Sequence, residues 1–266
     1  MTQAANVGDR FDGFVIDLDG VVWVGSKALP GAADALRTLR SRGRRLIYMT
    51  NDPRSSRVEY ASRLRELGVD VGDDDVVTAG AAMAAYLAEH EQAPGRTAYV
   101  IGSPALKEEL RAVGLRLVDG AGALEPAQLV IVGGHEDFNY AELRIATLAI
   151  HRGASFYAAG RDATFPMPDG PWPATGAILA AVETATGQRA RSFGKPDPFI
   201  FRLARTRLAG CRRVAVVGDS LEADIHGGQQ AGLTTILVLT GNASRVDLAR
   251  SPHTPDYVVD TLASLI

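Results

Sequence analysis

Short apolar runs, each ending in a polar residue and followed by a helix-like segment, recur along this chain of 266 residues. They include "FVID" at 14–17, "RRLIYMT" at 44–50, "RRVAVVGD" at 212–219 and "TTILVLTG" at 234–241. Continuous apolar strands that alternate with helices are typical of a parallel sheet covered by helices on both faces. The pattern therefore predicts an α/β fold built around such a sheet.

The middle of the chain repeats this style with enough elements for a small core of its own. We predict strands at 96–102, 115–119, 129–134 and 154–160, and helices at 103–114, 139–153 and 175–187. Ser103 is the expected N-cap of the first of these helices, with Pro104 at its first position. We therefore predict a discontinuous core domain at 1–81 and 187–266, and an inserted α/β domain at 82–186.

Composition excludes several classes of protein. Hydrophobic residues make up 46% of the chain and charged residues 22%, as in ordinary globular proteins, and a net charge of −3 does not favour nucleic acid as a partner. Cys211 is the single cysteine, so the chain cannot form an internal disulfide or a multi-cysteine zinc site. No apolar run is long enough to cross a membrane, and the first residues lack the pattern of a signal peptide. We expect a cytoplasmic protein without a membrane partner.

Polar side chains gather where the predicted core strands end. They are Asp17, Asp19, Thr50, Lys195, Asp219 and Asp224. Because the carboxyl ends of parallel strands share one edge of a sheet, we expect these residues to lie close together. Carboxylates placed together repel one another unless a cation balances them, and oxygen ligands alone suit Mg²⁺ better than zinc. The strand ends therefore predict a magnesium site.

The chain resembles the haloacid dehalogenase superfamily, and within it the NagD-type phosphatases of subfamily IIA, which have an inserted α/β cap domain. The resemblance runs nearly end to end. It is carried by "DLDGVVW", "LPGA", "TN", "VIVGG", "PDG", "GAILAAVETATG", "GKP", "GDSLEADI" and "AGLTTILVLTG". It implies a Rossmann-like doubly wound core, a cap at 82–186, and a Mg²⁺-dependent phosphatase. A carboxylate at Asp19, two residues after the first aspartate, favours phosphate chemistry over dehalogenation.

The resemblance also implies a role for each motif residue. Asp17 would be the nucleophile that forms an aspartyl-phosphate, and Asp19 would protonate the leaving oxygen and then deprotonate water. Thr50, Asn51, Asp52 and Lys195 would contact the substrate, with Thr50 and Lys195 also acting in catalysis. Mg²⁺ would be held by the carboxylates of Asp17 and Asp219 and by the backbone carbonyl of Asp19, with Asp224 just behind them.

The inserted domain is expected to act as a lid that excludes water and selects the leaving group. Its substrate-facing segment is predicted at 158–176, where the density of glycine and proline suggests a shaped loop rather than a regular element. Arg161 and Asp162 in that segment are predicted substrate contacts. The resemblance also makes a homodimer through the cap plausible.

Several alternatives remain open at this stage. The substrate is a small phosphorylated metabolite, and glycerol phosphate, phosphoglycolate, nucleoside monophosphates and sugar phosphates all fit. The same nucleophile would serve a phosphotransferase or a phosphomutase, and a non-catalytic sensor of a phosphorylated ligand is a further alternative. The five histidines show no metal-ligand spacing, although His226 follows Asp224 closely.

Overall fold

The computed structural model describes residues 6–91, 93–119, 126–167 and 169–266. The chain forms two compact units. Unit 1 consists of Met1–Thr50, Arg57–Val77 and Lys195–Ile266, and unit 2 of Asn51–Ser56 and Thr78–Gly194. Among the described residues, no helix is long and apolar enough to cross a membrane.

Unit 1 is built on a sheet of six strands in the order β15-β14-β13-β1-β4-β5. The strands are β1 Gly13–Asp17, β4 Arg45–Thr50, β5 Val76–Thr78, β13 Val214–Gly218, β14 Thr234–Val238 and β15 Tyr257–Val259. All the pairings between β15 and β4 are parallel. The chain leaves the central strand β1 toward β4 and later returns on the other side of β1 at β13. That reversal marks the edge of an open sheet where ligands bind.

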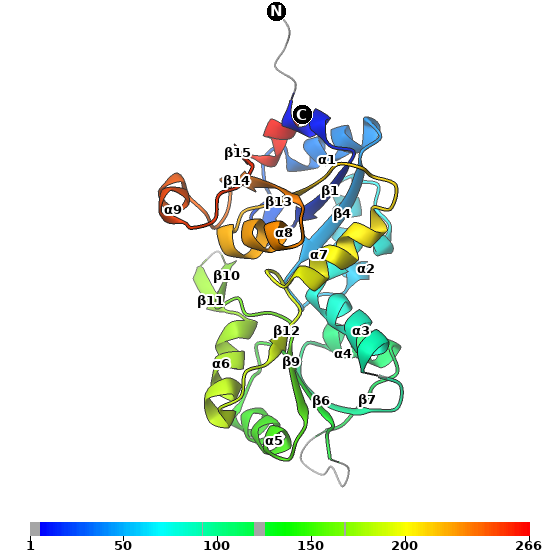
Figure 1. The fold of residues 1–266 in the computed structure, drawn as a ribbon, viewed down its shortest axis with the longest axis vertical. Helices are drawn as coiled ribbons and strands as arrows, with labels where there is room; N and C mark the ends of the chain where they lie inside the picture. The colour runs from blue at the N-terminus through cyan, green and yellow to red at the C-terminus, as the bar shows by residue number, and fades with distance from the viewer. Residues whose placement is uncertain (1–5, 92, 120–125, 168) are drawn as a thin grey trace, which may run out of the picture. The chain divides into compact units, whose positions relative to one another are not determined.

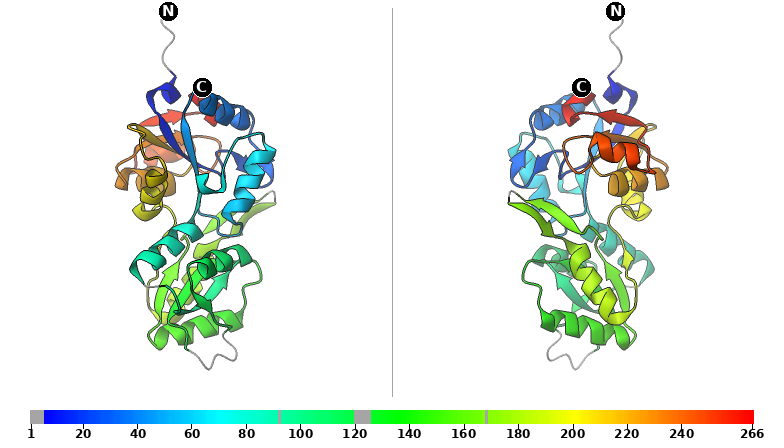
Figure 2. Two further views of the ribbon diagram at one scale, coloured as in Figure 1. Left: turned by 90° about the vertical axis from the view of Figure 1, so that its right-hand side faces the viewer. Right: turned by 90° about the vertical axis from the view of Figure 1, so that its left-hand side faces the viewer.

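Helices cover both faces of this sheet. They are α1 Ala32–Ser41, α2 Arg57–Glu66, α7 Pro198–Arg207, α8 Gly227–Gln230 and α9 Arg245–Arg250. Figure 2 shows α1 and α2 on one side of the sheet and α7 and α8 on the other. The apolar side chains of α1 and α2 join those of the strands in one core cluster that includes Phe14, Leu36 and Leu64. A small hairpin, β2 Trp23–Val24 with β3 Lys27–Ala28, follows β1.

Unit 2 has a parallel sheet of its own, with strands in the order β12-β9-β8-β6-β7. The strands are β6 Thr97–Gly102, β7 Arg116–Leu117, β8 Leu129–Gly134, β9 Ser155–Ala158 and β12 Arg191–Ser192. The helices are α3 Ala79–His90, α4 Pro104–Ala112, α5 Tyr140–His151 and α6 Thr175–Thr186. Figure 1 shows α5 and α6 on one side of this sheet and α3 and α4 on the other. The α/β fold predicted from the sequence, with a parallel sheet at its core, is confirmed.

The main part of unit 2 begins and ends a few residues away from the boundaries expected at 82 and 187, and unit 2 also includes Asn51–Ser56, which the sequence places in the core domain. Unit 2 takes in all of α3, because this helix packs against α4, and it takes in β12, because that strand pairs with β9. The expected cap of Ser103 on α4 is present, since the Ser103 hydroxyl accepts the backbone N–H of Leu106. Whether unit 2 acts as a cap stays a prediction.

The segment at 158–176 is more regular than the sequence suggests. It contains an antiparallel pair of strands, β10 Thr164–Met167 and β11 Gly170–Pro173, instead of one irregular loop. Prolines lower the expectation of a strand because they cannot donate to a neighbouring strand. In a ribbon of only two strands each strand has an unpaired edge, so prolines such as Pro171 and Pro173 are tolerated there. The expectation of an irregular loop was therefore wrong for 164–167 and 170–173.

Candidate active site

Three of the predicted site residues are placed by the register of the unit 1 sheet. Asp17 is the last residue of the central strand β1 and pairs with Met49, so it lies beside the end of β4 at Thr50. On the other side Ile16 pairs with Val217, and β13 ends one residue later, just before Asp219. The aligned strand ends therefore put Asp17, Thr50 and Asp219 at one edge, as the sequence predicts. All three are buried.

Lys195 joins two of the carboxylates at this edge. Its Nζ lies 2.6 Å from Oδ1 of Asp17 and 2.8 Å from Oδ1 of Asp224, and all three side chains are buried. Buried ion pairs persist only when their partners are well placed, because each charge has lost its hydration. The ammonium thus fixes the orientation of Asp17 and connects it to the turn that carries Asp224.

Burial and like charge dominate the electrostatics of this cluster. Burial raises the pKa of Asp17 well above its ordinary value, against the attraction of Lys195, and the neighbouring Asp224 and Asp219 raise it further. Burial and the charge of Asp224 raise the pKa of Asp219 to about 7. Burial alone would lower the pKa of Lys195, but Asp17 and Asp224 raise it above its ordinary value. The arrangement therefore favours added positive charge beside the carboxylates.

Asp219 is held by the loop that follows the next strand, β14. Oδ2 of Asp219 accepts the backbone N–H of Asn242 at 2.6 Å and the Asn242 side-chain amide at 2.9 Å. A Cβ at Gly241 would lie 1.9 Å from that same oxygen, so the close approach requires glycine. The sequence analysis missed Asn242. The rule used for the other residues could have found it, because this asparagine also follows the carboxyl end of a core strand.

Asp224 belongs to a π-helical turn, Leu221–His226, where the sequence predicts the first part of a helix. Its side chain is fully buried, with Oδ2 accepting the backbone N–H of Ser220 at 3.0 Å and Oδ1 bound to Lys195. A Cβ at Gly218 would lie 2.1 Å from Cγ of Asp224, so this carboxylate packs directly against the end of β13. π-Helical turns often occur at functional sites.

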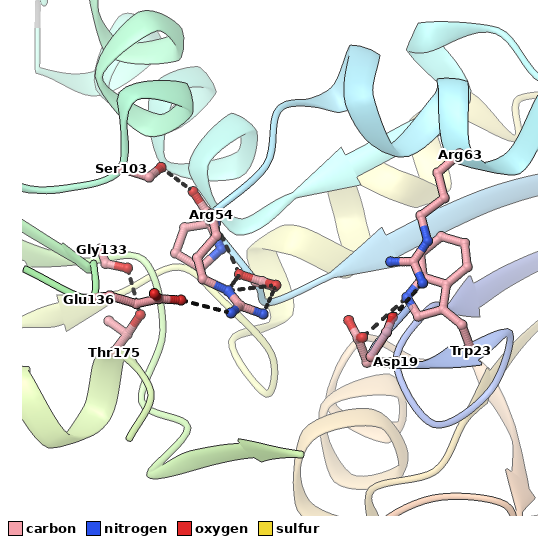
Figure 3. A network of polar contacts seen from close by, with 11 residues as sticks. Asp19, Trp23, Arg54, Arg63, Ser103, Gly133, Glu136 and Thr175 are labelled. Carbon is pink, nitrogen blue, oxygen red and sulfur yellow. Dashed lines mark hydrogen bonds and ion pairs between the residues drawn. The ribbon is translucent and has the colours of Figure 1, made fainter. Parts of the chain in front are cut away.

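Asp19 points to a different set of partners (Figure 3). The indole Nε1 of Trp23 donates to Oδ1 of Asp19 at 3.1 Å, and Trp23 is fully buried. The guanidinium of Arg63 lies 3.8 Å from the centroid of the Trp23 ring, and Tyr60 stacks against that ring. The sequence analysis assigned no role to Trp23 or Arg63, because no motif logic connects an indole to a carboxylate four residues before it.

The four other predicted substrate contacts belong to unit 2, where they contact one another or neighbouring residues. Asn51 donates from its side-chain amide to Oδ2 of Asp162 at 2.8 Å. Asp52 accepts a forked pair of hydrogen bonds from Arg54, whose guanidinium also approaches Glu136 (Figure 3). Their predicted role in binding substrate is not tested by these contacts.

Arg161 forms a second forked pair within unit 2. It binds Glu183 at 2.8 and 3.2 Å and donates to the carbonyl of Ala190 at 2.6 Å. Burial alone would raise the pKa of Glu183, but hydrogen bonds from Arg161 and from the backbone N–H of Ala190 hold it below its ordinary value. The contacts described for Arg161 are therefore those of a residue that ties the end of β9 to α6.

The residues at the strand ends fit a magnesium ion. Carboxylate oxygens of Asp17, Asp219 and Asp224 all lie within 4.8 Å of one another, and all three residues are buried. The donors are oxygen atoms only, which is the ligand chemistry of Mg²⁺. The raised pKa values of Asp17 and Asp219 indicate that these carboxylates are costly to ionise together without a cation.

Comparison with known proteins identifies the family of this chain. A family model described as haloacid dehalogenase-like hydrolase matches residues 14–116, and a second model for HAD-like hydrolases matches 192–265. Glycerol-3-phosphate phosphatase from Gallus gallus is 38% identical over 96% of this chain and 91% of its own length. The ribonucleotide monophosphatase NagD from Escherichia coli is 35% identical over 94% of this chain and 96% of its own.

A solved structure supports the same family assignment. Glycerol phosphate phosphatase from Mycobacterium tuberculosis, in complex with magnesium, superposes with a TM-score of 0.90 at 36% identity. The match covers 99% of this chain and 78% of that one. The predicted family, enzyme class and metal are confirmed. This chain belongs to the haloacid dehalogenase-like hydrolases and, among them, to the NagD-type phosphatases that use Mg²⁺.

Proposed function

We propose that this phosphatase hydrolyses glycerol phosphate or a related small phosphomonoester through a phosphoryl group carried by Asp17. The observation that carries the proposal is the buried cluster at the carboxyl edge of unit 1, in which Lys195 bridges Asp17 and Asp224 beside Asp219. Glycerol phosphate is the first choice because the names of similar proteins from Gallus gallus and Mycobacterium tuberculosis refer to it.

In the first half of the proposed reaction, a carboxylate oxygen of Asp17 attacks phosphorus and the bond to the leaving oxygen breaks. Asp19 gives its proton to that oxygen, so that an alcohol leaves rather than an alkoxide. In the second half, Asp19 takes a proton from water as the water attacks phosphorus. The bond to Asp17 then breaks, and inorganic phosphate and the free carboxylate result.

Trp23 is the proposed positioning residue for Asp19. Because its indole N–H donates to Oδ1, the proton that Asp19 transfers is carried on Oδ2. Lys195 orients Asp17 and stabilises the charge of the phosphoryl group. The Thr50 hydroxyl and the backbone of Asn51 donate hydrogen bonds to the phosphoryl oxygens. Mg²⁺, held by the carboxylates of Asp17 and Asp219 and the carbonyl of Asp19, supplies further positive charge to the phosphoryl oxygens when it is bound.

Unit 2 is the proposed cap, which excludes water and selects the alcohol part of the substrate. Asp52 and Asp162 remain proposed substrate contacts in this unit. The forked pair with Glu183 makes Arg161 a proposed support for that segment as well as a contact. A homodimer through unit 2 is part of the proposal, and sedimentation at two protein concentrations tests it. A cytoplasmic location is also proposed, consistent with the free, buried thiol of Cys211, and cell fractionation tests it.

The test is release of inorganic phosphate from a panel of glycerol phosphates, phosphoglycolate, nucleoside monophosphates and sugar phosphates. We expect release that requires Mg²⁺, stops in EDTA, and is fastest with a glycerol phosphate. Phosphate that appears on an added alcohol or sugar instead of in solution would identify a phosphotransferase or mutase. Tight binding of a phosphorylated ligand without turnover would identify a sensor and overturn the proposal.

A further inference from the structure

A second group of metal-binding side chains lies in unit 1 apart from the active-site carboxylates. Glu222, His226 and His253 each offer a ligand atom, and these atoms all lie within 4.8 Å of one another. Glu222 and His226 are four residues apart on the π-helical turn Leu221–His226, and His253 comes from the segment between α9 and β15. The sequence spacing does not reveal this group, because His253 is distant along the chain.

The three side chains are already in contact. Nε2 of His253 lies 3.0 Å from Oε2 of Glu222, and the rings of His253 and His226 stack with their centroids 4.1 Å apart. The side-chain amide nitrogen Nε2 of Gln230 lies 2.6 Å from Nε2 of His226. Two imidazoles and a carboxylate thus lie together at one partly exposed place. Because the two rings are stacked, at least one imidazole must rotate before both can bind the same ion.

The segment that carries His253 is held in place independently of these contacts. Gln229 on α8 donates to the carbonyl of Thr254 at 2.7 Å. Asp256 accepts the backbone N–H of Thr235 at 2.8 Å and its hydroxyl at 2.9 Å, which ties the segment to β14. Because both sides of the group rest on anchored backbone, binding an ion would require movement of the side chains and not of the backbone.

We propose that Glu222, His226 and His253 bind a zinc-class divalent ion, such as Zn²⁺ or Co²⁺, at a site separate from the magnesium site. Two histidines and one glutamate form a recognised zinc donor set, whereas Mg²⁺ prefers oxygen ligands alone. Ligand bonds of about 2.0–2.2 Å place tetrahedral donor atoms about 3.3–3.6 Å apart. Donor atoms that now lie within 4.8 Å of one another must therefore approach by up to about 1.5 Å. Half-exposed side chains can make that movement.

Binding at this site would stiffen the turn that also carries Asp224. Asp224 lies between Glu222 and His226 in the chain, and its carboxylate binds Lys195 and the backbone of Ser220. An ion that ties this turn to His253 would therefore raise the stability of unit 1, since a ligand that binds only the folded state stabilises it by mass action. This inference rests on the contacts of Glu222, His226 and His253 and does not depend on the proposed reaction.

The test is calorimetric titration of Zn²⁺ into the full-length protein, already saturated with Mg²⁺, followed by Co²⁺ absorption spectra. We expect one equivalent of Zn²⁺ to bind and the melting temperature to rise. We also expect binding to weaken at least about tenfold in His253→Ala and in Glu222→Gln. His226→Gln is a third variant in case one of these folds poorly. His151→Ala, which removes an exposed histidine of unit 2, is the matched control and should bind normally.

Three results would overturn the inference. The first is Zn²⁺ binding of equal strength in wild type, His253→Ala and His226→Gln. The second is loss of the Zn²⁺ equivalent in Asp219→Asn with retention in His253→Ala, which would place the ion on the active-site carboxylates. The third is absence of any Zn²⁺ binding by wild type.

Discussion

At the residue scale, the contact between Trp23 and Asp19 orients the carboxylate that is the proposed acid and base of the reaction. The N–H of Trp23 is the polar end of an otherwise apolar, fully buried side chain, and it donates to Asp19 Oδ1. Arg63 and Tyr60 fix the plane of the indole. A flexible carboxylate would lose orientation at the moment of proton transfer, and small misplacements of catalytic groups are costly.

Trp23→Phe removes the N–H donor and keeps an aromatic ring between Arg63 and Tyr60. Because only poor leaving groups need protonation, we expect kcat/KM to fall by about tenfold or more with glycerol phosphate. With p-nitrophenyl phosphate, whose phenolate leaves unaided, the loss should be no more than about twofold. Steady-state assays with both substrates measure the difference. An equal loss with both would show that Trp23 supports the fold and not the proton transfer.

At the element scale, Asp219 lies in the loop after β13, and the loop after β14 packs against its carboxylate. Gly241→Ala places a methyl group within contact distance of Asp219 Oδ2, so the carboxylate must move. We expect the Mg²⁺ concentration for half-maximal activity to rise about tenfold or more, with a smaller change in the maximal rate. Gly72→Ala, where the new Cβ meets no atom closer than 3.9 Å, is the control and should leave both values unchanged. An unchanged Mg²⁺ requirement in Gly241→Ala would contradict the assignment of Asp219 as a ligand.

At the amino ends of β1 and β13 in the unit 1 sheet, Asp12 connects the two strands. Its carboxylate accepts the backbone N–H groups of Arg212 at 2.9 Å and Arg213 at 2.7 Å, and these bonds lower the pKa of Asp12 from 3.8. A carboxylate whose pKa is depressed by folding adds stability above its unfolded pKa and loses it as the pH falls through the folded value.

We therefore expect Asp12→Asn to lower the free energy of unfolding by about 1 kcal/mol at neutral pH, a modest value because the group is partly exposed to solvent. The difference from wild type should shrink below about pH 4 and vanish once Asp12 is protonated in the folded protein. Urea unfolding at a series of pH values measures it. A difference that stays constant down to strongly acid pH would contradict the account.

The elements themselves show what the sequence can and cannot predict. The core strands β1, β4, β13 and β14 were predictable because each is a continuous apolar run that ends in a polar residue. The β10–β11 hairpin was not, because its prolines argue against strands unless both strands are edges. Nor was the π-helical turn at Leu221–His226, since its hydrogen bonding depends on Asp224 turning inward to Lys195.

At the scale of the whole molecule, each unit has a hydrophobic core cluster of its own among the described residues, and these two clusters share no residue. One gathers residues such as Phe14 and Leu36 of unit 1, and the other gathers residues such as Val132 and Leu179 of unit 2. The repeated strand–helix pattern predicts an inserted domain at 82–186, and that domain assignment stays a prediction. The exact boundaries of the two units were not predictable, because the place of β12 depends on its pairing with β9, which no local pattern encodes.

Separate cores predict that damage to one unit stays local. Leu179→Ala empties a buried position of α6, and we expect it to cost unit 2 about 2–5 kcal/mol. In hydrogen exchange, amides of β8 and β9 should lose protection while those of β1 and β13 keep it. Equal loss in both sheets would show that the units unfold together.

The central claim is that Asp17 carries the phosphoryl group, and trapping that adduct tests it most directly. The wild-type enzyme is mixed with substrate and Mg²⁺, quenched in acid within milliseconds, digested and examined by mass spectrometry. We expect a phosphoryl group on the peptide that contains Asp17, formed at the rate of turnover or faster, and neither adduct nor phosphate release in Asp17→Asn. Turnover that persists in Asp17→Asn, or a phosphoryl group on any other peptide, would contradict it.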